Sequence, residues 1–324
     1  MNHQHSKKPL LPQIYSWLLG VLLLSGLIMI VTHFVELEHF TNLARQAEPK
    51  WLMIALLLQI TTYFSAAGAW YVPLKKMGYR QSLWSLIPLG IAKLFTEQSL
   101  PTGGMSGTAF FIAALKKRSI PNSICISTLI VSLVAYYGAY LLAAVAAVVL
   151  LYFYHKLNEW IILISLIFAI VAVGIPTGTL WLRSIGKKEL PAILLRIPGL
   201  SGLMRAIGNS SVGMLHRPVL IFAIAFFHGT VFLMDSATLW VMLKVVGANV
   251  SFWTAFPSFI FASMVATVGP IPLGLGTFEI TSVTLLHMMG VSMEAALSAT
   301  LLLRGFTVWL PMLPGMLMTR WALR

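Results

Sequence analysis

The run Gly269-Pro270-Ile271-Pro272-Leu273-Gly274-Leu275-Gly276 interrupts a long apolar stretch, residues 252–289. Glycine and proline interrupt helices, and a bilayer tolerates such a break only where protein or a wet cavity surrounds the freed backbone groups. The stretch contains no Lys or Arg. It therefore predicts a broken helical segment that enters and leaves the membrane from the outside, not one continuous span.

A second broken stretch, residues 82–115, lies in the first half of the chain and contains Pro101-Thr102-Gly103-Gly104. Basic residues flank it on both sides, in the segments 75–80 and 116–118. Because Lys and Arg are retained in short cytoplasmic loops, both ends are expected in the cytoplasm. The stretch then forms a re-entrant pair of half-helices, and the alternative is a single broken span.

The remaining apolar stretches are long enough for full spans, since a helix needs about 20 apolar residues to cross the hydrocarbon. They are residues 14–34, 51–72, 123–151, 160–181, 219–242 and 295–318. The basic loops place both termini, including residues 1–13, in the cytoplasm, together with a basic interfacial segment at residues 183–217.

This assignment of spans and loops predicts an all-α polytopic membrane protein of about six full spans plus two re-entrant or broken helical segments. The two broken segments enter from opposite faces, which favours an inverted repeat with a site near the midplane. Residues 1–324 are expected to form a single integral membrane domain.

Composition supports this fold class and excludes others. The 324 residues are 58% hydrophobic and 10% charged, against about 45–50% and about 25% in soluble domains. The 22 basic residues exceed the 9 acidic ones but are scattered, which excludes a nucleic-acid surface and favours contact with anionic lipid headgroups. Cys125 is the single cysteine, so no internal disulfide forms, and neither a metal nor a cofactor is expected.

Few ionisable residues lie within the apolar stretches, where each costs about 2.5–3.5 kcal/mol on insertion scales. Lys93 and Glu97 are four residues apart on one helix face and can neutralise each other, as a binding element or as a structural ion pair. Arg304 lies midway along the last span. It requires either Glu279 or the phosphate of an anionic lipid as a partner, and we expect a pair for which a ligand can compete.

His228 and Asp235 are seven residues apart and share a helix face, which favours either a proton relay or ordinary interhelical hydrogen bonds. The glycine-rich breaks favour either half-helix N-termini that present N–H groups to an anion or close helix packing. The residues expected to bind substrate are Lys93, Glu97, Pro101, Gly103, Gly104, Pro272, Gly274, Gly276, Glu279 and Arg304.

The run 270–279, followed by Gly290-Val291-Ser292, Ala295-Ala296 and Leu303-Arg304, resembles the C-terminal signature of the lysylphosphatidylglycerol synthase transmembrane-region family, also called flippase-like. Pro101-Thr102-Gly103-Gly104 fits the first-half motif of that family. The resemblance covers residues 17–317 and implies an integral plasma-membrane protein, in bacteria usually of the inner membrane, that moves a lipid between leaflets. Fused members carry an aminoacyl-transferase domain, and this chain is expected to be a stand-alone member without it.

The sequence analysis therefore favours a transporter of an anionic or isoprenoid-type lipid, not an enzyme. No ATP-binding GxxxxGK[ST] run, GxSxG elbow or HExxH pair occurs, so neither ATP hydrolysis nor these types of catalysis are expected. One alternative is a non-catalytic membrane partner whose segment 183–217 docks a soluble lipid-modifying enzyme. Another is an intramembrane enzyme that uses Glu97 or Glu279 as a general base on a lipid headgroup.

Overall fold

The computed structural model describes residues 48–99, 105–186, 208, 213–269 and 274–322. Its contacts divide the chain into two units, Met1–Gln46 and Ala47–Arg324, and every described residue belongs to the second unit. The predicted span 14–34, the N-terminal segment 1–13 and most of the basic segment 183–217 lie outside the described residues.

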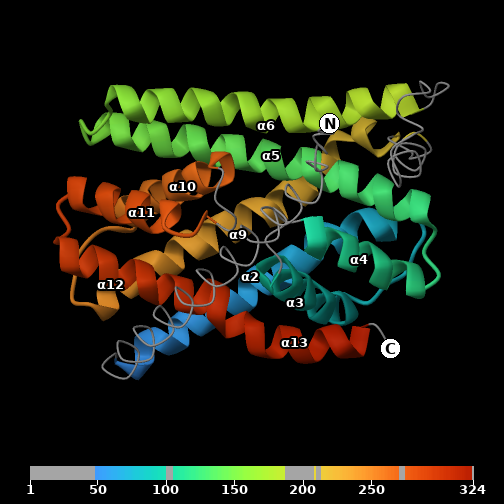
Figure 1. Ribbon diagram of the computed structural model, residues 1–324, viewed down its shortest axis with the longest axis horizontal. Coiled ribbons are helices and arrows are strands. Elements are labelled where there is room, and N and C mark those ends of the chain that lie inside the picture. The colour runs from blue at the N-terminus through green and yellow to red at the C-terminus, as the bar shows by residue number, and fades with distance from the viewer. Residues whose placement is uncertain (1–47, 100–104, 187–207, 209–212, 270–273, 323–324) are drawn as a thin grey trace, which may run out of the picture. The chain divides into compact units, whose positions relative to one another are not determined.

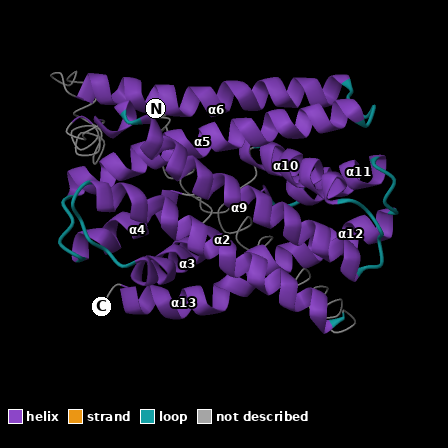
Figure 2. Ribbon diagram, turned by 180° about the vertical axis from the view of Figure 1, so that it is seen from behind, coloured by secondary structure: helices purple, strands orange, loops and turns teal. Residues whose placement is uncertain are grey.

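Every regular element in the described part of the chain is helical (Figures 1 and 2). A helix satisfies its backbone hydrogen bonds internally, which is a requirement within lipid. The elements are α2 (Pro49–Lys76), α3 (Leu83–Ser99), α4 (Met105–Lys117), α5 (Asn122–Phe153), α6 (Glu159–Gly186), η1 (Gly213–His216), α9 (Pro218–Val245), α10 (Phe252–Val268), α11 (Thr277–Met288), α12 (Met293–Arg304), η3 (Gly305–Trp309) and α13 (Leu310–Ala322).

The long apolar helices confirm the fold class. Among the described residues, five stretches have the length and composition to cross a membrane, namely α2, α5, α6, α9 and the run Met293–Ala322 that joins α12 to α13. They correspond to five of the six predicted spans. The protein is therefore a multi-pass, all-α membrane protein.

The first broken stretch forms a hairpin of α3 and α4 that is open at one end of the helical unit. Arg118, just after α4, donates from Nη1 to the Ser85 hydroxyl at 3.0 Å and from Nη2 to the Ser85 carbonyl at 3.3 Å. Ser85 lies in the first turn of α3, so the hairpin begins and ends at the same place. This agrees with the predicted pair of half-helices and not with a single broken span.

The second broken stretch forms the hairpin of α10 and α11, which points the other way. In Figures 1 and 2 the open ends of the two hairpins lie at opposite sides. Each hairpin packs against the last span of the other half of the chain, since α3 contacts α13 and α10 contacts α5. Each half of the chain, the first ending with α5 and the second with α13, therefore packs its hairpin against the other half.

The element bounds reveal an internal repeat. Helix α9 begins 169 positions after α2 (218 minus 49), and both helices have 28 residues and a proline at their start. The same offset relates α3 to α10, which have 17 residues each and carry Pro88 and Pro257 at equivalent positions. After the breaks the offset is 171, from the start of α5 to the start of α12 (293 minus 122).

The turns of the repeat match as well as the helices. Gly78 and Gly247 follow α2 and α9 with φ of 87° and 80°, a left-handed conformation that glycine adopts without a steric penalty. Helices α2 and α9 cross in opposite directions, because Gln59 meets Asp235 whereas the later residue Gly68 meets the earlier residue Phe227. The expected inverted repeat is thus visible in both the bounds and the direction of the helices.

Candidate functional site

The break in the second hairpin is built from glycines. Gly274 and Gly276 have φ of 65° and 79°, and a Cβ on Gly274 would lie 2.4 Å from the Cβ of Ala266 in α10. Only glycine therefore allows the chain to turn this closely against α10 and begin α11. Pro272 lies outside the described residues.

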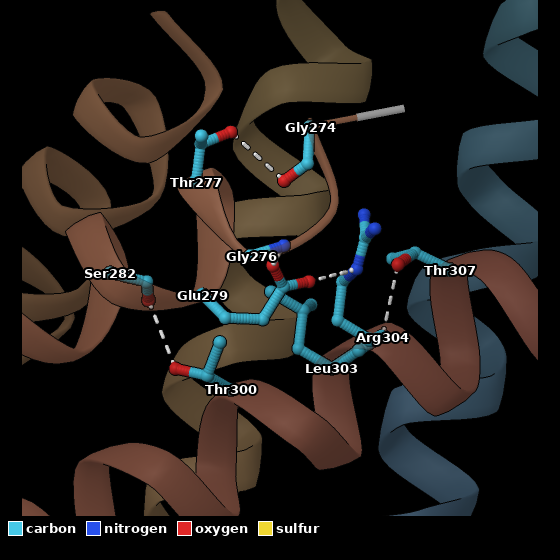
Figure 3. Close-up of polar contacts among 9 residues, drawn as sticks. All are labelled: Gly274, Gly276, Thr277, Glu279, Ser282, Thr300, Leu303, Arg304 and Thr307. Atoms are coloured by element: carbon cyan, nitrogen blue, oxygen red, sulfur yellow. Dashed lines mark hydrogen bonds and ion pairs between the residues drawn. The ribbon is translucent and has the colours of Figure 1, made fainter. Parts of the chain in front are cut away.

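Glu279 joins this break to the last span (Figure 3). It is the third residue of α11, and its Oε2 accepts a hydrogen bond from the Gly276 backbone N–H at 2.6 Å. Its Oε1 lies 2.6 Å from Nε of Arg304. A carboxylate in the first turn of a helix is stabilised by the helix dipole and by the free N–H groups, so Glu279 has favourable partners on both oxygens.

Arg304 lies at the end of α12 and is almost fully enclosed. The side chains of Arg304 and Glu279 are each 11% exposed, and the guanidinium carbon lies 5.3 Å from the centre of the Phe278 ring. The predicted pairing of Arg304 with Glu279 is confirmed. Its role in binding a ligand remains a prediction.

The last span differs from the uniform helix expected over residues 295–318. Directly after Arg304, residues Gly305–Trp309 form a π-helical turn, and the Thr307 hydroxyl donates to the Leu303 carbonyl at 3.0 Å (Figure 3). Short π-turns within α-helices occur frequently at functional sites. Here the turn places a local change of helix geometry beside the buried ion pair.

The first hairpin carries the second predicted pair. Lys93 Nζ lies 2.6 Å from Glu97 Oε1, with the two side chains 23% and 17% exposed. Ser106, at the start of α4, donates to the Thr96 carbonyl at 3.0 Å and holds the two helices together near the break. Pro101, Gly103 and Gly104 lie outside the described residues.

Gly107 is not among the predicted site residues, yet its lack of a side chain allows Glu97 to lie against α4. A Cβ at this position would be 2.2 Å from Cγ of Glu97 and 2.5 Å from the Lys93 carbonyl. The absence of a side chain therefore lets α4 cover the Lys93–Glu97 pair directly. Its place in the run Gly103-Gly104-Met105-Ser106-Gly107 was the signal that could have identified it.

We expect Gly107→Ala to displace Glu97 and to lower the free energy of unfolding by about 1–3 kcal/mol, the usual cost of overpacking. Thermal unfolding in detergent measures this effect. Gly90→Ala is the control, because Gly90 lies in α3 and no atom lies within 4 Å of the position that its Cβ would take. Equal loss of stability in both variants would contradict the close packing around Gly107.

His228 and Asp235 bind different helices. His228 Nε2 lies 3.0 Å from the Ser132 hydroxyl of α5, whereas Asp235 Oδ1 accepts from Gln59 Nε2 of α2 at 3.1 Å. The structure therefore gives each of them an interhelical partner and provides no direct contact between them among the described side chains. Gln59 was missed, although it is a rare amide within an apolar span.

A comparison with protein families adds the deciding observation. The model of the family described as "Lysylphosphatidylglycerol synthase TM region" matches residues 17–315. The chain belongs to this family. The comparison with curated proteins gives no match. Membership in the lysylphosphatidylglycerol synthase transmembrane-region family confirms the resemblance and supports a lipid-related role in the membrane.

In this family member the cations of the two ion pairs lie at similar distances along their helices. Lys93 lies 10 residues into α3 and Arg304 lies 11 residues into α12, or ~15 and ~16 Å from the starts of these helices at 1.5 Å per residue. Each pair therefore lies well away from the beginning of the helix that carries its cation. No group of three or more His, Cys, Asp and Glu side chains that could hold a metal ion occurs within the ranges the structure describes.

Proposed function

We propose that the protein moves an anionic or isoprenoid-type lipid between the leaflets of the plasma membrane, the inner membrane of a bacterium, with both termini in the cytoplasm. The lipid headgroup passes through the protein while the acyl or isoprenoid chains stay in the bilayer. No bond of the lipid is made or broken. The protein is then a transporter and not an enzyme.

The buried pair of Arg304 and Glu279 is the observation that carries this proposal. A guanidinium near the middle of the membrane is costly unless an anion accompanies it, and a phosphate can replace a carboxylate as that anion. When a phosphate replaces Glu279 as the partner of Arg304, Glu279 retains its hydrogen bond from the Gly276 N–H. The carboxylate is thus not left without a partner, which lowers the cost of the exchange.

The inverted hairpins supply a second cation for the headgroup, Lys93. Lys93 lies in the hairpin that opens toward one end, and Glu279 in the hairpin that opens toward the other (Figure 1). Lys93 is also balanced by a carboxylate, Glu97, and this pair is more exposed than the pair at Arg304. A headgroup moving between leaflets would exchange one cation for the other near the midplane, as inverted-repeat transporters hold their substrates.

The experiment is a lipid-movement assay in reconstituted vesicles. Fluorescent phosphatidylglycerol in the inner leaflet of vesicles containing the protein should become accessible to a membrane-impermeant quencher faster than in protein-free vesicles. Mass spectrometry of the recovered lipid should show no change in mass. Equal rates with and without protein, for phosphatidylglycerol and for a polyprenyl phosphate, would contradict transport and favour a docking role. A changed mass would favour an intramembrane enzyme.

A further inference from the structure

A polar cluster at the crossing of α2 and α9 lies apart from both ion pairs. Gln59 Nε2 lies 3.1 Å from Asp235 Oδ1 and 3.1 Å from Thr238 Oγ1. Thr62 Oγ1 lies 3.4 Å from the same Asp235 oxygen. Gln59, Thr62 and Thr238 are 1%, 8% and 0% exposed. Three of the four side chains are therefore buried and Asp235 is half-buried, and the cluster lies where the two halves of the repeat cross.

The hydrogen bonds of this cluster converge on one oxygen of Asp235, which accepts from both Gln59 Nε2 and Thr62 Oγ1. The Thr62 hydroxyl lies 3.2 Å from the Leu58 carbonyl, and the Thr238 hydroxyl lies 2.9 Å from the Met234 carbonyl, one turn back in each helix. A threonine that donates to its own helix presents its lone pairs elsewhere. Thr62 can therefore turn its hydrogen from Asp235 to the Leu58 carbonyl and offer its lone pairs to a cation. The Thr238 hydroxyl already donates to its own helix and accepts from Gln59 Nε2.

Asp235 also lacks a cationic partner in the part of the chain that the structure describes. The ion pairs there are Lys50–Glu48, Lys93–Glu97 and Arg304–Glu279, and α2 carries no Lys or Arg between Lys50 and Lys75. The nearest ionisable group along α9 is His228, two turns away and bonded to Ser132. An ionised carboxylate at membrane depth requires compensation.

We propose that Asp235, Thr62, Thr238 and Gln59 form a binding site for a sodium ion. Hard cations take oxygen ligands, at roughly 2.3–2.6 Å in the case of calcium, so oxygens 3.4 Å apart can contact one ion together. A half-turn of the Gln59 amide presents its oxygen in place of its nitrogen. The single carboxylate balances one positive charge, which favours a monovalent over a divalent ion in this largely buried site.

Sodium bound here would hold α2 against α9 and so fix the relative position of the two halves. Any effect of sodium on lipid movement rests on the proposed function. Binding of the ion does not, because it depends on the cluster alone. A test of binding therefore separates the failure of this site from the failure of the transport proposal.

The test measures thermal unfolding of the full chain in detergent at pH 8, with sodium chloride replaced stepwise by choline chloride at constant ionic strength. A ligand that binds the folded state raises the unfolding temperature as its concentration rises. The wild-type protein should show this rise, and it should also bind radioactive sodium. Asp235→Asn should abolish both effects.

Two threonine pairs provide matched variants in which valine replaces the hydroxyl with a methyl group of similar size. Thr62→Val and Thr238→Val should raise the sodium concentration needed for half of the shift by roughly tenfold, a typical effect of disturbing a metal site. Thr61→Val and Thr230→Val should leave it unchanged, since these threonines make the same bond to their own helix and lie outside the cluster. Stability that depends on pH but not on sodium would overturn the proposal and assign a proton to Asp235. Equal shifts in all variants would also overturn it.

Discussion

Replacing Arg304 with alanine is expected to slow lipid movement roughly tenfold to a hundredfold. Under the proposed function the substitution removes the charge-assisted hydrogen bonds that Arg304 would give to a headgroup phosphate, worth about 1.5–3 kcal/mol. Each 1.36 kcal/mol changes a rate about tenfold. The vesicle assay with fluorescent phosphatidylglycerol measures the rate. Arg304→Lys should lie between alanine and wild type, because lysine keeps the charge but not the planar fork of donors.

Arg320→Ala is the control for this variant. Arg320 is exposed and lies in the last turn of α13, so its loss also removes one positive charge without touching the ion pair. It should move lipid at the wild-type rate. If Arg304→Ala does the same, Arg304 has only a structural role.

Replacing Glu279 with alanine is expected to lower the free energy of unfolding by about 3–5 kcal/mol, as when one partner of a buried ion pair is removed. The substitution takes away the carboxylate beside Arg304 and also the acceptor of the Gly276 N–H. The unfolding temperature in detergent should fall by roughly 5 °C or more. Glu294→Ala, at an exposed acid in the first turn of α12, should have little effect.

The double variant Glu279→Gln, Arg304→Met separates structure from function. It removes both buried charges, and replacing a buried pair with uncharged groups of similar size is often neutral or stabilising. We expect its unfolding temperature to lie close to that of wild type while lipid movement stays as low as in Arg304→Ala. Recovery of both stability and transport would show that the pair serves packing alone.

The sequence predicted the two broken helical hairpins and the partner of Arg304, because these depend on local composition. An arginine in an apolar span needs an anion, and Glu279 in the preceding segment was the natural one within the chain. The cluster around Asp235 could not be predicted in the same way. Gln59 and Asp235 are 176 positions apart, and no local pattern indicates that α2 and α9 cross at these residues.

Gly107 and the π-helical turn show the same limit. A glycine within a helix indicates close approach in general, but only the packed structure shows that Glu97 is the residue that approaches it. The turn at Gly305–Trp309 follows a continuous apolar pattern that predicts a plain α-helix. Only the structure shows that this turn directly follows Arg304.

The sequence by itself determined that this is a polytopic helical membrane protein with two breaks, because hydrophobic length and basic loops are properties of contiguous residues. Tertiary structure alone decided which half-helix packs against which span, where the two halves cross and which polar side chains meet there. The physical reason is that apolar helices expose similar surfaces to lipid and to each other, so shape and a few buried polar contacts select the partners.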